Sequence, residues 1–425
     1  MALTKIQPNI IAVANNVTNK TVGNTTSIPS FTFDGSGVVT SASNVAISGA
    51  GITANTVANS AFQTGSVENY LRGANLDFGM RNRIINGAMV IDQRNAGAAF
   101  NNTTSGVYSA DRWKTYGAQS AKFSIQQDSS ANTVAGFTSS LKVTSLSSYS
   151  LVTSDQFDVY QLIEGYNIAD LAWGTASAKT ITLSFWTRSS LTGTFGGSVR
   201  NTSANRSYPF TYTINAANTW EYKTITIPGE TTGTWEKTTS TGIILLFGLG
   251  THSGLSGPAG AWASTNYVSA TGATSIVGTN AATWYVTGVQ LEAGSSPTPF
   301  EYRQYGTELQ LCQRYYYLWV KGNASTTQEM GMGFYLNNTE VDVKVYLPVS
   351  MRTNPSLSQV TGTNYYRFTR SGGSDDFDSL TLERCNASNS IISLYNDTQM
   401  SGTGGVAGNM LSFNAAAFMS FTAEL

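Results

Sequence analysis

The side chains best suited to chemistry in this sequence are aromatic residues beside an arginine on two expected strands. In the stretch 181–188 apolar and polar residues alternate, and a strand with its odd-numbered side chains in a core leaves Trp186 and Arg188 outward. The same alternation in 220–227 turns Trp220 and Tyr222 outward. Aromatic rings can stack on the apolar face of a pyranose while planar polar groups reach its hydroxyls, so these four residues predict a sugar-binding surface. The alternative is that the rings pack under a loop or against another copy of the chain.

A second candidate site lies toward the C-terminal end of the sequence. Tyr365 and Arg367 fall on one face of an expected strand, and the stretches 371–378 and 401–408 read as long mobile loops. Loops on a rigid β scaffold commonly carry recognition. The candidate ligand-binding residues here are Tyr365, Arg367, Asp375 and Asp376. The alternative is that both stretches are ordinary turns.

The sequence gives little support for metal binding or for catalysis. Three acids close together, at 375, 376 and 378, could collect Ca²⁺, although the spacing of a calcium-binding loop is absent. Glycoside cleavage needs a pair of carboxylates, and no motif singles out a pair here. The acids weighed for it, on predicted loops or strand ends, are Asp155, Asp158, Glu164, Glu230 and Glu236. His252 lies in a glycine-rich loop without a nucleophile partner. We therefore expect a non-catalytic protein without metal or cofactor.

The composition excludes several classes of partner. The 425 residues carry 24 lysines and arginines against 25 aspartates and glutamates, so the net charge is −1. No basic surface is available for phosphate contacts, which argues against nucleic acid. No apolar run approaches about eighteen residues and the first residues lack the pattern of a secretory signal, so we expect neither membrane insertion nor Sec export. One histidine and two cysteines cannot build a multi-ligand zinc site, and whether Cys312 and Cys385 pair stays open.

Alternating strands dominate residues 108–303. The run 243–247 is apolar on both faces and flanked by glycines, which suits a central strand covered on both sides. Many strands, polar turns and almost no helical periodicity predict an all-β chain with a two-sheet antiparallel sandwich over 77–304.

One expected helix precedes a second β domain. Thr307 and Gln310 fit a capping box. The residues that then share one side at three- and four-residue spacing are Leu309, Cys312, Tyr316 and Trp319. We expect a connecting helix over 305–319 and, because alternation resumes after it, a smaller β-sandwich over 320–425 that forms the receptor-binding tip.

Residues 1–76 differ from the rest of the chain. They hold five charges and almost no aromatics, and their isolated apolar residues predict strands of only three or four residues. One copy cannot bury enough apolar area to offset its ordering entropy. Two interpretations remain: a disordered leader, or an extended fibre segment in which several copies wrap together. The near absence of charge favours the fibre segment.

Several segments resemble a known family when their order is considered together. They are Ile85–Arg94, an I-N-G-x-M-x-x-x-Q-R pattern; Tyr108–Trp113, a Y-x-x-D-R-W pattern; Gln290–Gly294, a Q-L-E-x-G pattern; and the final Thr422–Leu425. Their order resembles bacteriophage tail-fibre or receptor-binding proteins with a jelly roll like that of carbohydrate-binding modules.

The resemblance implies a virion component of the phage tail. It implies a homotrimer whose N-terminal segment contacts other tail or neck proteins and whose β domains bind a glycan or another receptor on the host cell. We interpret Asp111–Trp113 as a structural strand element, with Asp111 and Arg112 paired at the mouth of the fold. A structural calcium ion beside Glu292, as jelly rolls of this kind often have, stays open. A polysaccharide-degrading tailspike is one alternative, although no fixed-period repeat is visible. A structural head or neck fibre or an adaptor is another.

Overall fold

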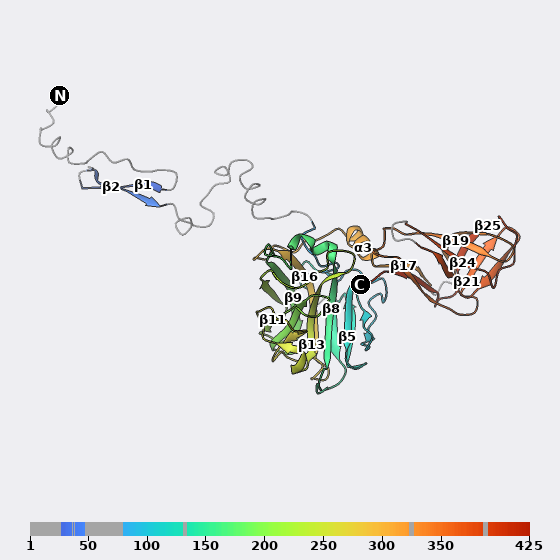
Figure 1. Ribbon diagram of the computed structural model, residues 1–425, viewed down its shortest axis with the longest axis horizontal. Helices are drawn as coiled ribbons and strands as arrows, with labels where there is room; N and C mark the ends of the chain where they lie inside the picture. The colour runs from blue at the N-terminus through green and yellow to red at the C-terminus, as the bar shows by residue number, and fades with distance from the viewer. Residues whose placement is uncertain are drawn as a thin grey trace, which may run out of the picture. The chain divides into compact units, whose positions relative to one another are not determined.

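The protein is built almost entirely from β-strands (Figure 1). The computed structural model describes residues 27–35, 37, 39–46, 80–130, 134–322, 327–385 and 390–425. The chain forms two compact units, 1–76 and 77–425. The all-β fold class predicted from the sequence is confirmed.

The described part of the first unit is a β-hairpin. Strands β1 (Ser27–Phe33) and β2 (Val39–Ala46) pair antiparallel. With seven and eight residues they are longer than predicted, because serine and threonine positions join the backbone ladder as well as the apolar ones. Phe31 and Phe33 remain 47% and 59% exposed. The rest of the predicted fibre segment lies outside the described residues.

Two six-stranded antiparallel sheets form the predicted sandwich in the second unit. The first, here the β8 sheet, contains in spatial order β11 (Ser207–Ile214), β10 (Gly193–Arg200), β13 (Thr241–Thr251), β8 (Gln156–Glu164), β5 (Trp113–Gly117) and β4 (Val107–Tyr108). The second, here the β9 sheet, contains β12 (Glu221–Ile227), β9 (Ile181–Ser189), β16 (Thr283–Ala293), β7 (Ser140–Ser145), β6 (Phe123–Asp128) and β3 (Phe100–Asn101).

The sandwich core lies between these sheets. Phe157 and Val159 of β8 and Leu183 and Phe185 of β9 are fully buried in it. Because successive side chains of a strand point to opposite faces, the even-numbered residues of both strands lie on the outer faces. Those outer faces carry the candidate sites described below.

Strand β13 is covered on both faces, as predicted. Leu245 and Phe247 belong to the sandwich core, whereas Ile244 and Leu246 pack on the outer side against Val268. The cover comes from the connection between β13 and β16. It contains η4 (Ser253–Leu255), β14 (Ser256–Gly257) and β15 (Ser269–Ala270).

The connecting helix is shorter than predicted. Helix α3 spans Tyr305–Gln313, its N-cap residue is Gln304, and no side chain caps it. The predicted capping box is therefore wrong. Tyr316 and Trp319 lie in β17 (Tyr316–Lys321) instead of on the helix, because this segment pairs antiparallel with residues near the end of the chain.

The C-terminal region forms two further antiparallel sheets around a second core. One contains β17, β26 (Phe418–Thr422) and β20 (Ser356–Val360). The other contains, in spatial order, β22 (Gly373–Phe377), β21 (Tyr366–Arg370), β25 (Ala407–Ser412), β18 (Gln328–Tyr335), β19 (Val341–Tyr346), β24 (Ile391–Asn396) and β23 (Thr381–Arg384). The predicted loop 371–378 is mostly strand: β21 and β22 form a tight hairpin, which glycines at 372 and 373 allow with positive φ.

The end of the chain packs against the sandwich. Arg112, a buried residue just before β5, forms an ion pair with Glu424, which also binds Arg94 at 2.8 Å. Figure 1 shows the C-terminus beside β5 and β8. Asp111 accepts from Gln93 and lies 3.4 Å from Arg94. The predicted pairing of Asp111 with Arg112 is therefore wrong: the two residues lie in a turn, in which Arg112 has a φ of 70°, and each binds other partners.

Neither cysteine forms a disulfide. Cys312 is buried in a small cluster under helix α3, and Cys385 lies half-buried at the edge of the C-terminal core. Within the described residues, no helix has the length and apolar content to cross a membrane.

Candidate functional site

All four residues predicted on the sandwich lie together on the outer face of the β9 sheet. Trp186 of β9 stands directly opposite Tyr222 of β12, with ring centroids 5.3 Å apart, and Tyr222 is 43% exposed. The guanidinium carbon of Arg188 lies 5.1 Å from the ring centre of Tyr285, and the ring of Trp220 lies 6.1 Å from it. The structure thus brings these side chains together, while their binding role stays a prediction.

Two further side chains complete this surface, which we call the aromatic face. It consists of Lys142, Trp186, Arg188, Trp220, Tyr222 and Tyr285. In the strand register Tyr285 of β16 has Arg188 on one side and Lys142 on the other. Alternation around the inward Trp284 was the signal that could have found Tyr285. The rings form two pairs, Trp186 with Tyr222 and Trp220 with Tyr285, and both cations lie over Tyr285, which holds these side chains in place.

A cavity of about 280 Å³ lies on the outer face of the opposite sheet. We call it the Asp158 pocket; its lining residues are Tyr116, Gln156, Asp158, Tyr160, Leu162, Arg200, Ile244 and Leu246. Alternate residues of β8 enter it from one strand, since side chains two apart share a face. In the register Asp158 stands opposite Tyr116 of β5, and Arg200 of β10 stands opposite Ile244 of β13.

The pocket contains a carboxylate and a guanidinium whose hydrogen-bonding capacity the protein fills only in part. Asp158 is 1% exposed; its Oδ2 accepts a hydrogen bond from Gln156 Nε2 at 2.5 Å, whereas its Oδ1 has no partner. Arg200 donates from Nη1 to Asn266, whereas its buried Nε has no partner. One acceptor and one donor of the lining residues therefore lack a partner within the protein.

Burial sets the ionisation of this carboxyl. Loss of hydration raises the pKa of Asp158 to about 7, against the opposing effects of the Gln156 hydrogen bond and the positive charge of Arg200. Burial also lowers the pKa of Arg200, opposed by Asp158 and Tyr160. A buried carboxyl that titrates near neutral pH beside a cation is typical of functional sites.

The sequence interpretation missed this pocket. It placed Asp158 on a loop or strand end, but Asp158 lies inside β8. The signal was present: apolar Phe157 and Val159 point inward, so the acid between them and the following Tyr160 had to face outward. Four residues from three other strands complete the site, and their proximity depends on strand order, which no local pattern encodes.

The predicted C-terminal residues do not converge on one site. Arg367 and Asp376 stand opposite each other and form a bidentate ion pair, with the guanidinium carbon of Arg367 3.8 Å above the ring of Phe413. Asp375 is next to Asp376 and points to the other face. There it binds Arg370 and the hydroxyl of Tyr335. Tyr365 lies just before β21, half-buried at the edge of the core. The charges of Arg367, Asp375 and Asp376 are therefore paired within the protein.

The acids considered for metal binding are also held by protein groups. Glu292 accepts hydrogen bonds from Gln290 and from the backbone and hydroxyl of Thr298. Asp378 accepts from the backbone of Asn364. Among the described residues, no group of three acidic, histidine or cysteine side chains is arranged to hold a metal ion.

The carboxylates weighed for catalysis are separated as well. Glu164 binds Arg314 and Tyr315, both at 2.6 Å, and Glu230 binds Arg206 at 2.5 Å. These contacts join elements of the fold. Asp158 is the only one of the five candidates that lines the Asp158 pocket.

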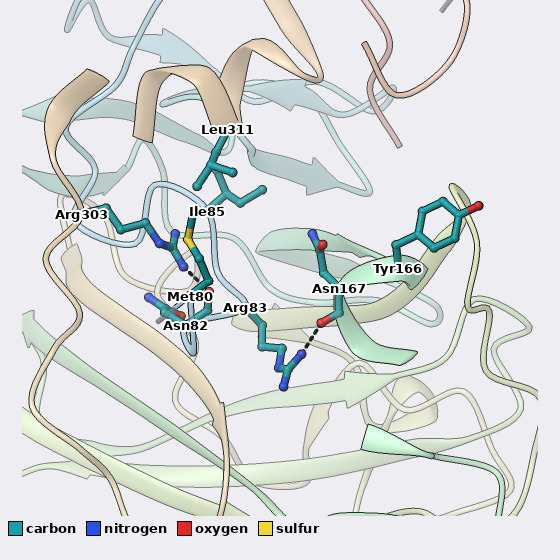
Figure 2. Close-up of a pocket in the computed structure, with 8 residues that line it drawn as sticks. All are labelled: Met80, Asn82, Arg83, Ile85, Tyr166, Asn167, Arg303 and Leu311. Carbon is teal, nitrogen blue, oxygen red and sulfur yellow. Dashed lines mark hydrogen bonds between the residues drawn. The ribbon is translucent and has the colours of Figure 1, made fainter. Parts of the chain in front are cut away.

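A larger cavity, of about 350 Å³, lies between helix α3 and the segment that enters the sandwich (Figure 2). In Figure 2, Arg83 donates to the backbone carbonyl of Asn167 and Arg303 to that of Asn82. Arg83 also forms a bidentate ion pair with Asp170. Because their terminal nitrogens are engaged by protein oxygens, these two cations anchor the segment to the sandwich and offer little to a ligand.

No protein-family model matches the sequence, and no curated protein matches it. Similar solved structures include the enzymatically active domain of bacteriophage CBA120 tailspike protein 4, at 11% identity and a TM-score of 0.28. The match covers 50% of this chain and 22% of that one, so the chain corresponds to about a fifth of the tailspike domain.

Two other similar structures are matched over nearly their whole length. A putative sugar binding protein from Bacteroides thetaiotaomicron is 10% identical, with 50% of this chain and 100% of that chain covered and a TM-score of 0.30. A family 11 carbohydrate-binding module from Clostridium thermocellum is 14% identical, with 47% and 98% covered and a TM-score of 0.24. The three TM-scores, between 0.24 and 0.30, describe a distant likeness over about half of the chain.

Proposed function

We propose that this protein is a bacteriophage tail fibre that attaches the virion to its host by binding a bacterial surface glycan without altering it. The observation that carries glycan binding is the Asp158 pocket, in which Asp158 Oδ1 and Arg200 Nε lack protein partners. Sugar hydroxyls donate and accept hydrogen bonds, so one sugar can satisfy both groups. Tyr116 and Tyr160 supply ring surface for its apolar face.

The phage role rests on the order of segments in the sequence. The patterns at Ile85–Arg94, Tyr108–Trp113 and Gln290–Gly294 resemble those of phage tail-fibre or receptor-binding proteins. In the fold the first two of these patterns meet: Asn86 donates to the backbone of Asp111, and Trp113 donates to the backbone of Asn86. The resemblance therefore lies in residues that build the frame of the sandwich.

A non-catalytic role fits the chemistry of the pocket. Cleavage of a glycosidic bond commonly uses two carboxyl groups about 5–9.5 Å apart. The lining residues of the Asp158 pocket include one carboxyl group. Binding without cleavage is the simpler use of such a site.

Assembly into a homotrimer would cover the first unit and multiply weak sites. The β1–β2 hairpin exposes Phe31 and Phe33, and an isolated two-stranded hairpin is marginally stable. Sister copies of residues 1–76 would supply the missing cover, and the same segment would contact other tail or neck proteins. Three linked sites raise avidity well above the affinity of one site.

Purified full-length protein on an array of bacterial surface glycans tests the proposal, together with adsorption of the protein to host cells. We expect binding that Tyr160→Ala weakens by tenfold or more and that Asp397→Asn, an exposed acid in the C-terminal region, leaves unchanged. If Tyr222→Ala abolishes glycan binding and Tyr160→Ala does not, the glycan binds to the aromatic face instead of the Asp158 pocket. Shortened polysaccharide after incubation would indicate a tailspike enzyme instead. No binding to glycans or cells would favour a structural fibre or adaptor.

A further inference from the structure

The surroundings of Asp158 are asymmetric in charge. From β10 the guanidinium of Arg200 faces the pocket, and from β5 and β8 the phenols of Tyr116 and Tyr160 do so. Lys114 of β5 lies one position further out, with its ammonium 6.0 Å from the ring centre of Tyr160. Strand β13 contributes only apolar side chains. The carboxyl and the guanidinium are therefore the two ionic groups that line the pocket.

These two groups define complementary requirements. An ionised carboxylate accepts hydrogen bonds only, and a guanidinium donates only. A ligand that satisfies both offers a donor to Asp158 and an acceptor to Arg200, and neighbouring hydroxyls of a neutral sugar offer both. An acidic sugar brings a second carboxylate into a pocket whose negative group is already buried, which costs free energy.

Building on the proposed glycan-binding function, we infer that the Asp158 pocket selects a neutral sugar and binds it when Asp158 is ionised. One sugar hydroxyl donates to Asp158 Oδ1, and a neighbouring hydroxyl accepts from Arg200. Protonation turns the unsatisfied oxygen from an acceptor into a donor or removes its charge. The site then loses the stronger, charge-assisted hydrogen bond.

The direction of the pH dependence follows from burial. Because burial raises the pKa of Asp158 to about 7, the carboxyl is mostly protonated at pH 5.5 and mostly ionised at pH 8.5. Affinity should therefore rise with pH across neutrality, in the range where an ordinary aspartate is already fully ionised. The bound sugar in turn favours the ionised form and shifts its titration to lower pH.

The test is the glycan array probed at pH 5.5 and pH 8.5 with the full-length wild-type protein, Asp158→Asn and the control Asp397→Asn. We expect the wild type to bind neutral glycans roughly tenfold or more tightly at pH 8.5 than at pH 5.5. Asp158→Asn should lose most of that binding and its pH dependence, while Asp397→Asn should behave as wild type. Circular dichroism checks that each variant is folded. The comparison of wild-type binding at the two pH values tests the inference even if a variant fails to fold.

The outcomes separate the two levels of inference. Three results would overturn the role of Asp158 but leave glycan binding in place. They are equal binding of the wild type at both pH values, binding of acidic glycans only, and a pH dependence that persists in Asp158→Asn. Wild type that binds no glycan at either pH overturns the proposed function itself, and this inference with it.

Discussion

The carboxylate of Glu424 forms an ion pair with the guanidinium of Arg112, which lies buried beside the first long strand of the sandwich. The same guanidinium donates to the backbone carbonyl of Leu162 and lies 3.6 Å above the ring of Tyr315. One buried cation therefore joins the sandwich, the short link between helix α3 and β17, and Glu424 near the end of the chain.

Removing this partner should destabilise the second unit strongly. Glu424→Gln leaves the buried charge of Arg112 uncompensated, which typically costs about 3–5 kcal/mol. Urea unfolding followed by tryptophan fluorescence measures the loss. The control is Arg384→Ala, which breaks an exposed ion pair with Glu383. Such a pair contributes about 0–1 kcal/mol. Equal effects of the two substitutions would contradict the role assigned to Glu424.

Asp158→Asn should change how stability depends on pH. In the unfolded chain an aspartate has a pKa of about 3.9, and in the folded protein Asp158 has a pKa of about 7. The folded state thus holds the proton more tightly, so the wild type loses stability as the pH rises from about 4 through about 7. Three pKa units correspond to at most about 4 kcal/mol. We expect the variant to lack this loss in chemical unfolding at pH 5 and pH 8.5; parallel profiles for both proteins would refute it.

The aromatic pair on the β9 sheet should contribute to stability on its own. Trp186→Ala removes the ring contact with Tyr222, and such pairs are worth about 0.5–1.5 kcal/mol beyond the buried area. Tyr222→Ala should cost a similar amount, and the double substitution less than the sum of the two. Thermal unfolding of the four proteins completes the cycle. Strict additivity would mean that the rings do not interact in solution.

The full-length protein should be a trimer in solution. A chain that begins at residue 78 lacks the β1–β2 hairpin with its exposed Phe31 and Phe33, so it should assemble less stably. Light scattering coupled to size-exclusion chromatography measures both masses. A monomeric full-length chain at micromolar concentration would rule out cover by sister copies.

The two cysteines should react differently with a thiol reagent. Cys312 is fully buried, and burial raises its pKa well above the ordinary value, so little of the reactive thiolate forms. Cys385 is half-buried, with its thiol 3.7 Å from the carbonyl of Pro355. We expect one fast-reacting thiol in the native protein and two in denaturant. A chain that shows no free thiol in denaturant would instead contain a disulfide.

The alternation of apolar and polar residues was sufficient to predict the strands and the face on which each side chain lies. Alternation put Trp186 and Tyr222 on the same outer surface because period-two geometry is fixed by the backbone. It failed after helix α3, because the three-residue spacing of Tyr316 and Trp319 matches a helix, whereas the pairing of β17 with β26 makes this segment a strand. The Asp158 pocket was out of reach because Asp158 and Arg200 come together through sheet order, and their ionisation depends on burial that the sequence does not display.

The ion pair between Arg112 and Glu424 also has a consequence for synthesis. The two residues are 312 positions apart. A ribosome that adds roughly 5–20 residues per second needs about 15–60 s to cover that distance. Throughout this interval Arg112 in the sandwich has no ion-pair partner, because Glu424 has not yet been synthesised. The nascent sandwich should therefore be looser than the mature one until Glu424 has been synthesised and has paired with Arg112.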